Sequence, residues 1–322
     1  MQLQFTTLDV FTSTRLQGNP LAVVQVPGSL RCHLTQPIKQ KIAQEFNLSE
    51  TVFLHDVKAA SAEAREIDIF TVEREVPFAG HPTVGTAVLV RHHMGGTEKV
   101  QSLVTKAGPI GIETSAPSKE IRAKIPHNIH LHERTLRNVL SSTETAGLHP
   151  NPAIREAELG APIFSVVNGM TFILVALPSL DLLTQVKVLR LDFEALSASL
   201  LDDGWTDSLV CRYYYVDVDG DEQGGENSGK IRYLRTRMVE LGFEDPATGS
   251  AATALASYLT LNEEKSGGNF HITQGVEIGR KSVISVETTT KGARVGDGYQ
   301  LDELWLGGTA VVTMQGTLEV DV

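Results

Sequence analysis

The sequence has little cysteine and no excess of positive charge, and both facts restrict its class. Cys32 and Cys211 are the only cysteines among 322 residues, which excludes a disulfide framework and a four-cysteine zinc site. The formal net charge of −11 argues against nucleic acid or an anionic membrane surface as a partner. A small anionic ligand would therefore have to be held by local hydrogen-bond donors.

Long hydrophobic runs and nucleotide-binding glycine motifs are also missing. No apolar run approaches the length of a transmembrane helix, and Met1–Phe11 is predicted to form a strand rather than a signal peptide. No Gly-x-Gly-x-x-Gly follows a predicted strand, so a dinucleotide cofactor is not indicated. We expect a cytoplasmic globular protein that is long enough for two domains.

A short motif is present twice. His81-Pro82-Thr83-Val84-Gly85-Thr86-Ala87 recurs as Asp245-Pro246-Ala247-Thr248-Gly249-Ser250-Ala251, 245 − 81 = 164 positions later. An ionisable residue and a proline before an alanine-rich run are typical of a helix start. The unpaired N–H groups and the positive dipole end of such a helix favour a carboxylate. Two such starts suggest two half-sites for one small anion.

The repeat extends beyond the motif. A pair of strands, a helix and two further strands precede each copy, and more strands follow it. The predicted elements of the first half are Leu8–Phe11, Leu21–Val26, Gln36–Phe46, Thr51–Leu54, Ile67–Thr71 and Thr83–His92. Those of the second half are Ile163–Val167, Thr171–Leu177, Asp192–Leu201, Ser208–Val216, Ile231–Arg237 and Ala247–Leu259.

These elements predict an α+β fold with two similar domains that arose by internal duplication. Each domain is expected to be a mixed sheet or barrel wrapped around a central helix, since the second motif helix is apolar nearly all round. We place the domains at residues 1–128 and 129–322. The last strands, around Ala310–Val320, could pack on either half.

The chain resembles the PhzF-like (phenazine biosynthesis protein) family, which shares its fold with diaminopimelate epimerase. The matching segments occur in family order across nearly the whole chain. They are Asp9–Phe11 with Gly18–Val24, Leu48–Phe53, Phe78–Ala87, Glu244–Ala251 and Gln274–Arg280. The resemblance implies an active site in a cleft between the two domains, and a homodimer. It also implies proton-transfer chemistry without a cofactor, as in isomerisation of a dihydro-hydroxyanthranilate.

Glu50 is the principal candidate for catalysis. It lies between a predicted helix and a predicted strand, where a desolvated carboxyl group would have a raised pKa and could carry a proton near neutral pH. The alternative is an exposed glutamate at a helix–strand junction. The resemblance implies catalysis, because the Ser-Glu-Thr-Val-Phe context is where the family places its general acid/base.

His81 and Asp245 are the next candidates. Each is predicted at the N-cap of its motif helix or just before it. Asp245 could serve only as a cap, because aspartate is a preferred N-cap residue, whereas histidine is a poor one. The resemblance implies that both line the cleft with Glu50, where they orient the substrate or relay protons.

The remaining candidates are expected to bind the substrate. Thr86 and Ser250 occupy equivalent positions in the two turns, and capping of the first helical turn is the alternative for both. Gly80 and Gly249 would let backbone N–H groups approach the ligand closely. Gln274 follows a predicted strand and could make a polar contact to the ligand.

Two other functions stay open. Neither turn contains cysteine, so a two-thiol racemase is excluded, but an epimerase or racemase that uses Glu50 with His81 or Asp245 is not. The other alternative is a metabolite-binding or scaffold protein without turnover.

Two apparent metal motifs are not taken as sites. His127, His130 and His132 could act as ligands, but a zinc site needs further ligands in a defined geometry, and a polar interdomain strand or linker is favoured. Asp217–Lys230 is similar to a calcium-binding loop, yet Glu222 and Ser228 replace its required glycine and final glutamate. No metal is therefore expected.

Overall fold

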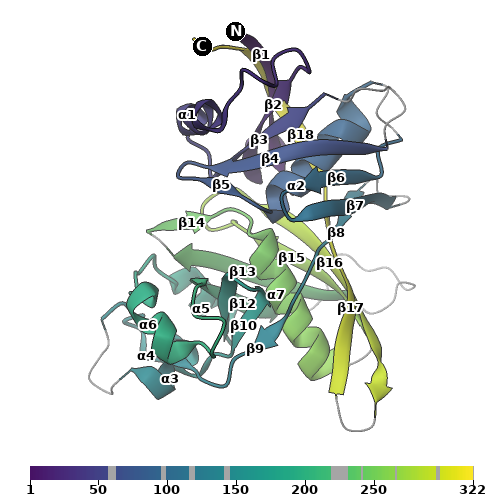
Figure 1. Ribbon diagram of the computed structural model, residues 1–322. Coiled ribbons are helices and arrows are strands. Elements are labelled where there is room, and N and C mark those ends of the chain that lie inside the picture. The colour runs from purple at the N-terminus through teal and green to yellow at the C-terminus, as the bar shows by residue number, and fades with distance from the viewer. Residues whose placement is uncertain are drawn as a thin grey trace. The chain divides into compact units, whose positions relative to one another are not determined.

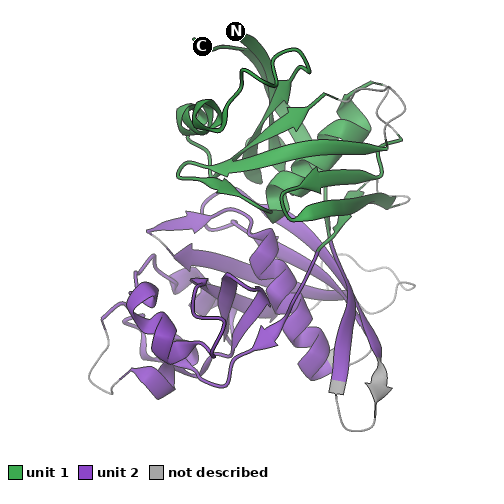
Figure 2. Cartoon of the chain, in the orientation of Figure 1, with its two compact units in different colours: residues 1–125, 306–322 green, residues 126–305 purple. Residues whose placement is uncertain are grey.

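The computed structural model describes residues 1–56, 63–95, 99–115, 120–140, 146–218, 231–240, 242–264, 267–294 and 298–321. The chain forms two compact units (Figure 2). Unit 1 comprises residues 1–125 together with residues 306–322, and unit 2 comprises residues 126–305. The acidic segment Asp217–Lys230 lies mostly outside the described residues, since only Asp217 and Val218 belong to them.

Unit 1 contains a mixed sheet. Its strands are β1 Gln2–Val10, β2 Asn19–Val26, β3 Glu50–His55, β4 Ala64–Thr71, β5 Glu75–Val76, β6 Ser102–Thr105, β7 Gly108–Ser115, β8 Glu120–Lys124 and β18 Ala310–Glu319. The β2–β3 and β4–β6 pairs are parallel, whereas β1–β2, β3–β4, β4–β5, β6–β7 and β7–β8 are antiparallel. β18 is antiparallel to β1, so the last strand completes the unit that begins the chain.

Helix α2, Gly80–Val88, is the core element of unit 1. All nine of its residues are buried, and it contacts β1, β2 and β3 (Figure 1). A Cβ atom added at Gly85 would lie 2.6 Å from Val10 Cγ2 and 2.7 Å from Leu21 Cδ2. Glycine is therefore needed where the helix crosses the sheet. Helix α1, Gln36–Phe46, packs against β3 and β4.

Unit 2 has the strands β9 His130–Leu131, β10 Ile163–Val167, β11 Met170–Ala176, β12 Leu209–Val218, β13 Ile231–Glu240, β14 Phe243–Asp245, β15 Gly268–Gln274, β16 Ser282–Arg294 and β17 Gly298–Gly308, the last of which ends in unit 1. Its helices are α3 Leu136–Val139, α4 Pro152–Gly160, α5 Leu180–Gln185, α6 Phe193–Leu200 and α7 Gly249–Leu259. Helix α7 contacts β10, β11, β15 and β16 and is mostly buried, as its apolar sequence predicts.

The two units repeat one topology. In unit 2, the β11–β12 and β13–β15 pairs are parallel, and β10–β11, β12–β13, β13–β14 and β15–β16 are antiparallel. This is the pattern of β1 to β7 in unit 1, in the same order. Each central helix also continues into a π-helical turn, Leu89–His93 after α2 and Thr260–Glu264 after α7. The repeated pairing supports an internal duplication.

The two motif copies differ in where their helices begin. Helix α2 starts at Gly80, so it contains the whole first motif, whereas α7 starts at Gly249, near the end of the second. The predicted starts at Thr83 and Ala247 were therefore wrong in opposite directions. Helices α3 to α5 in unit 2 were not predicted. α3 and α5 have only four and six residues, too few for a clear apolar period.

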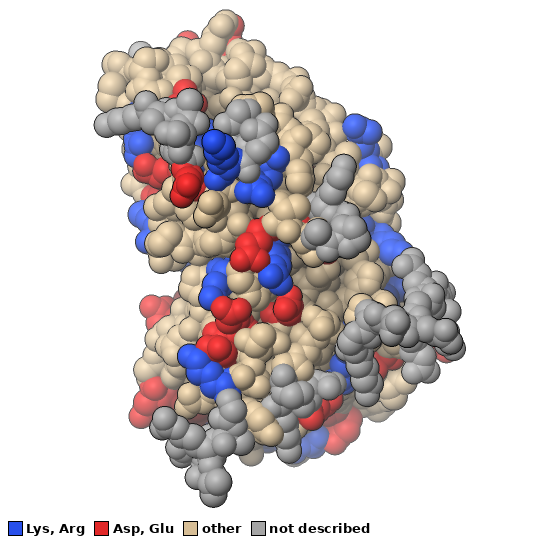
Figure 3. Space-filling model, turned by 90° about the vertical axis from the view of Figure 1, so that its right-hand side faces the viewer, with Lys and Arg blue, Asp and Glu red and all other residues tan. Residues whose placement is uncertain are grey.

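Charges of both signs lie close together on the surface in Figure 3. The ion pairs of the described residues include Arg122 with Glu113 and Arg232 with Asp217 and Glu263. Among the described residues, no helix is long and apolar enough to cross a membrane.

Candidate active site

Glu50 is the first residue of β3 and pairs with Thr71 of β4. The other five residues of the strand are buried, and only Glu50 at its start is partly exposed. The Glu50 side chain is 20% exposed. Burial raises the pKa of its carboxyl group, and a hydrogen bond with the Ser49 side chain opposes this to a smaller extent. The result is a carboxyl group that holds its proton to higher pH than an exposed glutamate does.

His81 lies beside Glu50 within unit 1. Its side chain is 6% exposed, and its Nδ1 atom is 3.6 Å from Glu50 Oε2. That oxygen has no hydrogen-bond partner among the described residues. Strand β3 and helix α2 thus bring together a desolvated carboxyl group and an imidazole, a combination suited to proton transfer.

The capping positions predicted for the two motif residues were wrong. The N-cap of α2 is Ala79, and His81 is the second residue inside the helix. The N-cap of α7 is Thr248, three residues after Asp245. In the first copy Thr83 bonds Ala79 O through both its N–H and its hydroxyl group, which extends the helix toward its N-terminus.

Hydrogen bonds in unit 2 hold the second motif copy out of the helix. Asp245 Oδ2 accepts a hydrogen bond from Thr248 Oγ1 at 2.7 Å. Gln274 Oε1 accepts from Thr248 N at 3.2 Å, and Gln274 Nε2 donates to Asp245 O at 2.8 Å. The turn that carries Asp245 is therefore built around the Gln274 amide group.

The predicted contact of Gln274 with a ligand stays a prediction. Gln274 is fully buried, and its oxygen also lies 3.0 Å from the Tyr213 hydroxyl group. Gln274 is thus a positioning residue for the turn. A second support of this turn was not predicted. Arg237 makes a bidentate ion pair with Glu244, at 2.9 and 2.6 Å. Only the β13–β14 pairing brings that arginine to the residue before Asp245.

The remaining predicted binding residues divide by burial. Gly80 and Gly249 are the buried first residues of α2 and α7, and Ser250 is half-buried in the first turn of α7. Thr86 is the seventh residue of α2 and fully buried, and its hydroxyl group has no hydrogen-bond partner among the described residues. Its predicted place in the first helical turn was therefore wrong.

The two thiols lie away from both motif turns in sequence. Cys32 is exposed, and Cys211 is buried in β12. Burial raises the pKa of the Cys211 thiol to about 12, so it stays protonated at neutral pH and is a poor base.

Glu50 and His81 belong to unit 1, and Asp245 belongs to unit 2. A cleft shared by all three stays a prediction.

The sequence profile of the phenazine biosynthesis-like protein family (PhzC-PhzF) matches residues 8–316. The chain belongs to this family. An uncharacterized isomerase of Mesorhizobium japonicum is 31% identical over 96% of both chains. The trans-2,3-dihydro-3-hydroxyanthranilate isomerase of Pseudomonas fluorescens is 30% identical over 98% of both chains. A Bacillus anthracis phenazine biosynthesis protein of the PhzF family has a similar fold, with a TM-score of 0.70 at 22% identity over 99% of this chain and 100% of that one.

The comparisons confirm the family and the fold class predicted from the sequence. They also confirm the enzyme class, since relatives of about 30% identity over nearly the full length are named isomerases. The protein is an isomerase of the PhzF family.

Proposed function

We propose that this PhzF-family isomerase moves a proton between two carbon atoms of a small carboxylate-bearing metabolite without an added cofactor. The observation that carries the proposal is the position of the desolvated Glu50 carboxyl group, 3.6 Å from the buried His81 imidazole. A general acid/base works best when its pKa is close to the working pH, and burial shifts that of Glu50 in this direction.

The reaction needs one proton carrier. Glu50 removes a proton from one carbon atom, and the electron pair of the broken C–H bond shifts an adjacent double bond. Glu50 then returns the proton to another carbon atom of the same molecule, so substrate and product have the same composition. Neither an oxidant nor a second substrate is consumed.

His81 and Asp245 are proposed to assist Glu50. His81 Nδ1 faces the carboxylate and can stabilise its ionised form or orient it. For Asp245 the proposal depends on the motif Asp245-Pro246-Ala247-Thr248-Gly249 and on the rigid turn that Gln274 maintains. Replacing Asp245 with Asn tests this assignment by itself, because the variant preserves the shape of the side chain.

The substrate class is inferred from the relatives. The Pseudomonas fluorescens relative is named for trans-2,3-dihydro-3-hydroxyanthranilate, an unsaturated ring with a carboxylate. The first assay therefore follows this compound by NMR in D2O. Cyclic and unsaturated carboxylic acids form the remaining panel, and solvent deuterium that appears at a carbon atom reports proton transfer even without net conversion.

Glu50→Gln is the deciding variant, since glutamine is nearly isosteric but cannot carry the proton. We expect proton transfer to fall by about 10²–10⁴-fold with an unchanged circular dichroism spectrum. Glu45→Gln, at an exposed position of α1, is the matched control and should keep full activity. Equal rates for Glu50→Gln and the wild type would remove Glu50 from the mechanism. Binding without exchange for every acid tested would favour a metabolite-binding protein.

A further inference from the structure

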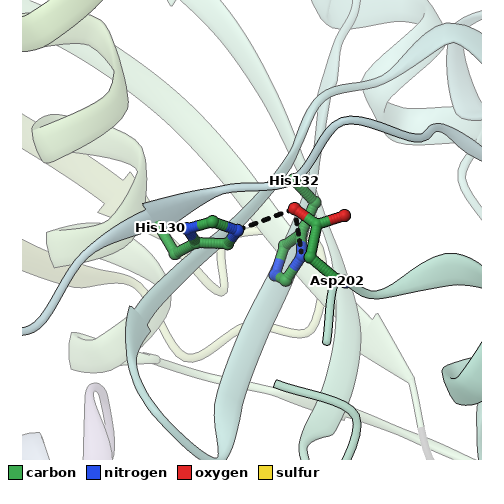
Figure 4. Close-up of side chains that lie close together, drawn as sticks. All are labelled: His130, His132 and Asp202. Atoms are coloured by element: carbon green, nitrogen blue, oxygen red, sulfur yellow. Dashed lines mark hydrogen bonds and ion pairs between the residues drawn. The ribbon is translucent and has the colours of Figure 1, made fainter. Parts of the chain in front are cut away.

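Two histidines and an aspartate form a compact group in unit 2, apart in sequence from the proposed catalytic residues (Figure 4). His130 is the first residue of β9, His130–Leu131, and His132 is the residue directly after this strand, a spacing that directs both side chains to the same side of extended backbone. Asp202 follows helix α6. Its Oδ2 atom lies 2.7 Å from His130 Nε2 and 3.6 Å from His132 Nδ1.

Hydrogen bonds orient the His132 ring. Its Nδ1 atom accepts from the backbone N–H of Asp202 at 3.1 Å, and its Nε2 atom lies 2.9 Å from Ser165 Oγ. The proton of the neutral ring is therefore on Nε2, and the lone pair on Nδ1 points toward Asp202. A histidine that binds a metal commonly donates its other N–H to such a partner, which sets the tautomer.

The Ser165 hydroxyl group belongs to a buried chain of hydroxyl groups. It lies 2.6 Å from Thr171 Oγ1, which in turn lies 2.7 Å from Ser208 Oγ. This chain connects β10, β11 and the start of β12, so the ring of His132 is supported by the sheet itself. Hydrogen bonds of this kind fix the rotamer of a ligand side chain.

His130 is on the open side of the group. Its ring is stacked on Trp205 with ring centroids 4.9 Å apart and planes within 11°, and its side chain is 34% exposed. The His132 side chain is fully buried, and that of Asp202 is 22% exposed. An ion from solvent can therefore reach the group on the side of His130. His132 and Asp202 are less exposed and are held by hydrogen bonds to the surrounding protein.

We propose that His130 Nε2, His132 Nδ1 and Asp202 Oδ2 bind a zinc ion. One ligand atom from each of the three residues lies within 4.8 Å of the other two, and two imidazole nitrogens with one carboxylate oxygen are a common zinc donor set. The ion takes the place of the proton between His130 and Asp202 and competes with the Asp202 N–H for His132. Water completes the coordination on the exposed side. Zinc then links β9 to the segment after α6 and stabilises unit 2.

A second group of similar composition lies in unit 1, but its acidic residues are already paired with cationic side chains. His55, Glu66 and Asp68 in unit 1 also have ligand atoms within 4.8 Å of one another. There the Lys39 ammonium group already bonds Asp68, and Arg31 bonds Glu66. Cations of the protein neutralise this group. Among the described residues, in contrast, no Lys or Arg side chain pairs with Asp202, whose side chain contacts the two histidines and the Glu133 N–H.

The test uses the full chain, freed of metal by EDTA and of any purification tag, and titrates it with ZnCl2 in a calorimeter. We expect one ion per chain and a rise in the melting temperature with zinc. His130→Gln and Asp202→Asn should each weaken binding by at least about tenfold. His127→Gln, which removes a histidine from the same segment, and His55→Gln, from the other group, are matched controls with wild-type affinity.

Three results would overturn the proposal. They are no saturable binding by the wild type, wild-type affinity in both His130→Gln and Asp202→Asn, or the same loss in the controls. His132→Gln is checked by circular dichroism before titration, because His132 is buried, and His130→Gln carries the test if that variant does not fold. Glu50→Gln should bind zinc normally, which separates this site from the proposed isomerase site.

Discussion

Glu50 Oε2 lies 3.6 Å from His81 Nδ1 inside unit 1. The carboxylate is at the first residue of a strand and the imidazole is in the first turn of a buried helix, so two rigid elements set their separation. Burial raises the pKa of the carboxyl group. The pair is therefore prepared for proton transfer before any substrate binds.

The raised pKa predicts the pH dependence of the reaction. If Glu50 must be ionised to remove the first proton, kcat/KM rises with pH, and its midpoint lies above 4.5, the ordinary value for this group. Rates measured between pH 4 and pH 9 on an accepted substrate give this midpoint. A midpoint at or below 4.5 would contradict a desolvated Glu50 as the base.

The same pKa has a consequence for stability. Glu50 binds its proton more tightly in the folded than in the unfolded chain, so its contribution to the free energy of unfolding is fully present below pH 4.5 and is lost as pH rises through the folded pKa. Glu50→Gln does not titrate. Its stability relative to the wild type should therefore increase from pH 4 to pH 8 in urea unfolding, while that of Glu45→Gln should not.

The thiols should be dispensable. We expect Cys32→Ser combined with Cys211→Ala to retain turnover, because Cys32 is exposed and the buried Cys211 thiol is protonated at neutral pH. Alkylation of the wild type by iodoacetamide should modify Cys32 and leave the rate unchanged. Loss of turnover in a folded double variant would point to a cysteine mechanism.

Gln274 should be important for the stability of unit 2. Gln274→Ala leaves Thr248 N, Asp245 O and the Tyr213 hydroxyl group without this partner, and we expect a loss of at least about 2 kcal/mol in the free energy of unfolding. Tyr213→Phe should cost about 1 kcal/mol. Gln36→Ala, at an exposed position, is the control in the same urea titration and should change little.

Asp68 should stabilise the protein at neutral pH and not in strong acid. Burial by itself would raise the pKa of Asp68, but hydrogen bonds from His55 and Lys39 outweigh it and lower the pKa from 3.8 to about 2. The contribution is present above pH 3.8 and is lost as pH falls through 2. We expect Asp68→Asn to cost about 2 kcal/mol at pH 7, and the difference from the wild type to shrink in unfolding experiments near pH 2. A difference that does not depend on pH would contradict the ion-pair explanation.

Local signals explain most of the elements that were predicted correctly. Helix α1 has the predicted bounds Gln36–Phe46, and Asn168-Gly169 joins β10 to β11 as predicted. The side-chain period and turn residues that define these elements are properties of neighbouring residues. The apolar run after Gly249 likewise predicts the buried helix α7.

The first residues of helices α2 and α7 could not be predicted from neighbouring residues alone. Asp245 and His81 occupy equivalent motif positions, yet only His81 is helical. Asp245 is the last residue of β14 and pairs with Met238, and the Gln274 amide group bonds both Asp245 O and Thr248 N. No local pattern around residue 245 could indicate a partner 29 residues away.

The amino-acid sequence by itself determined the duplicated α+β fold, the family and the residue types available for proton transfer, because periodicity and motifs are encoded locally. Tertiary structure alone decided that His81 faces Glu50, that Gln274 supports the turn of Asp245, and that Asp202 joins His130 from 72 residues away. Each of these contacts depends on strand pairing and helix packing, which bring distant residues within a few ångströms and change their solvation.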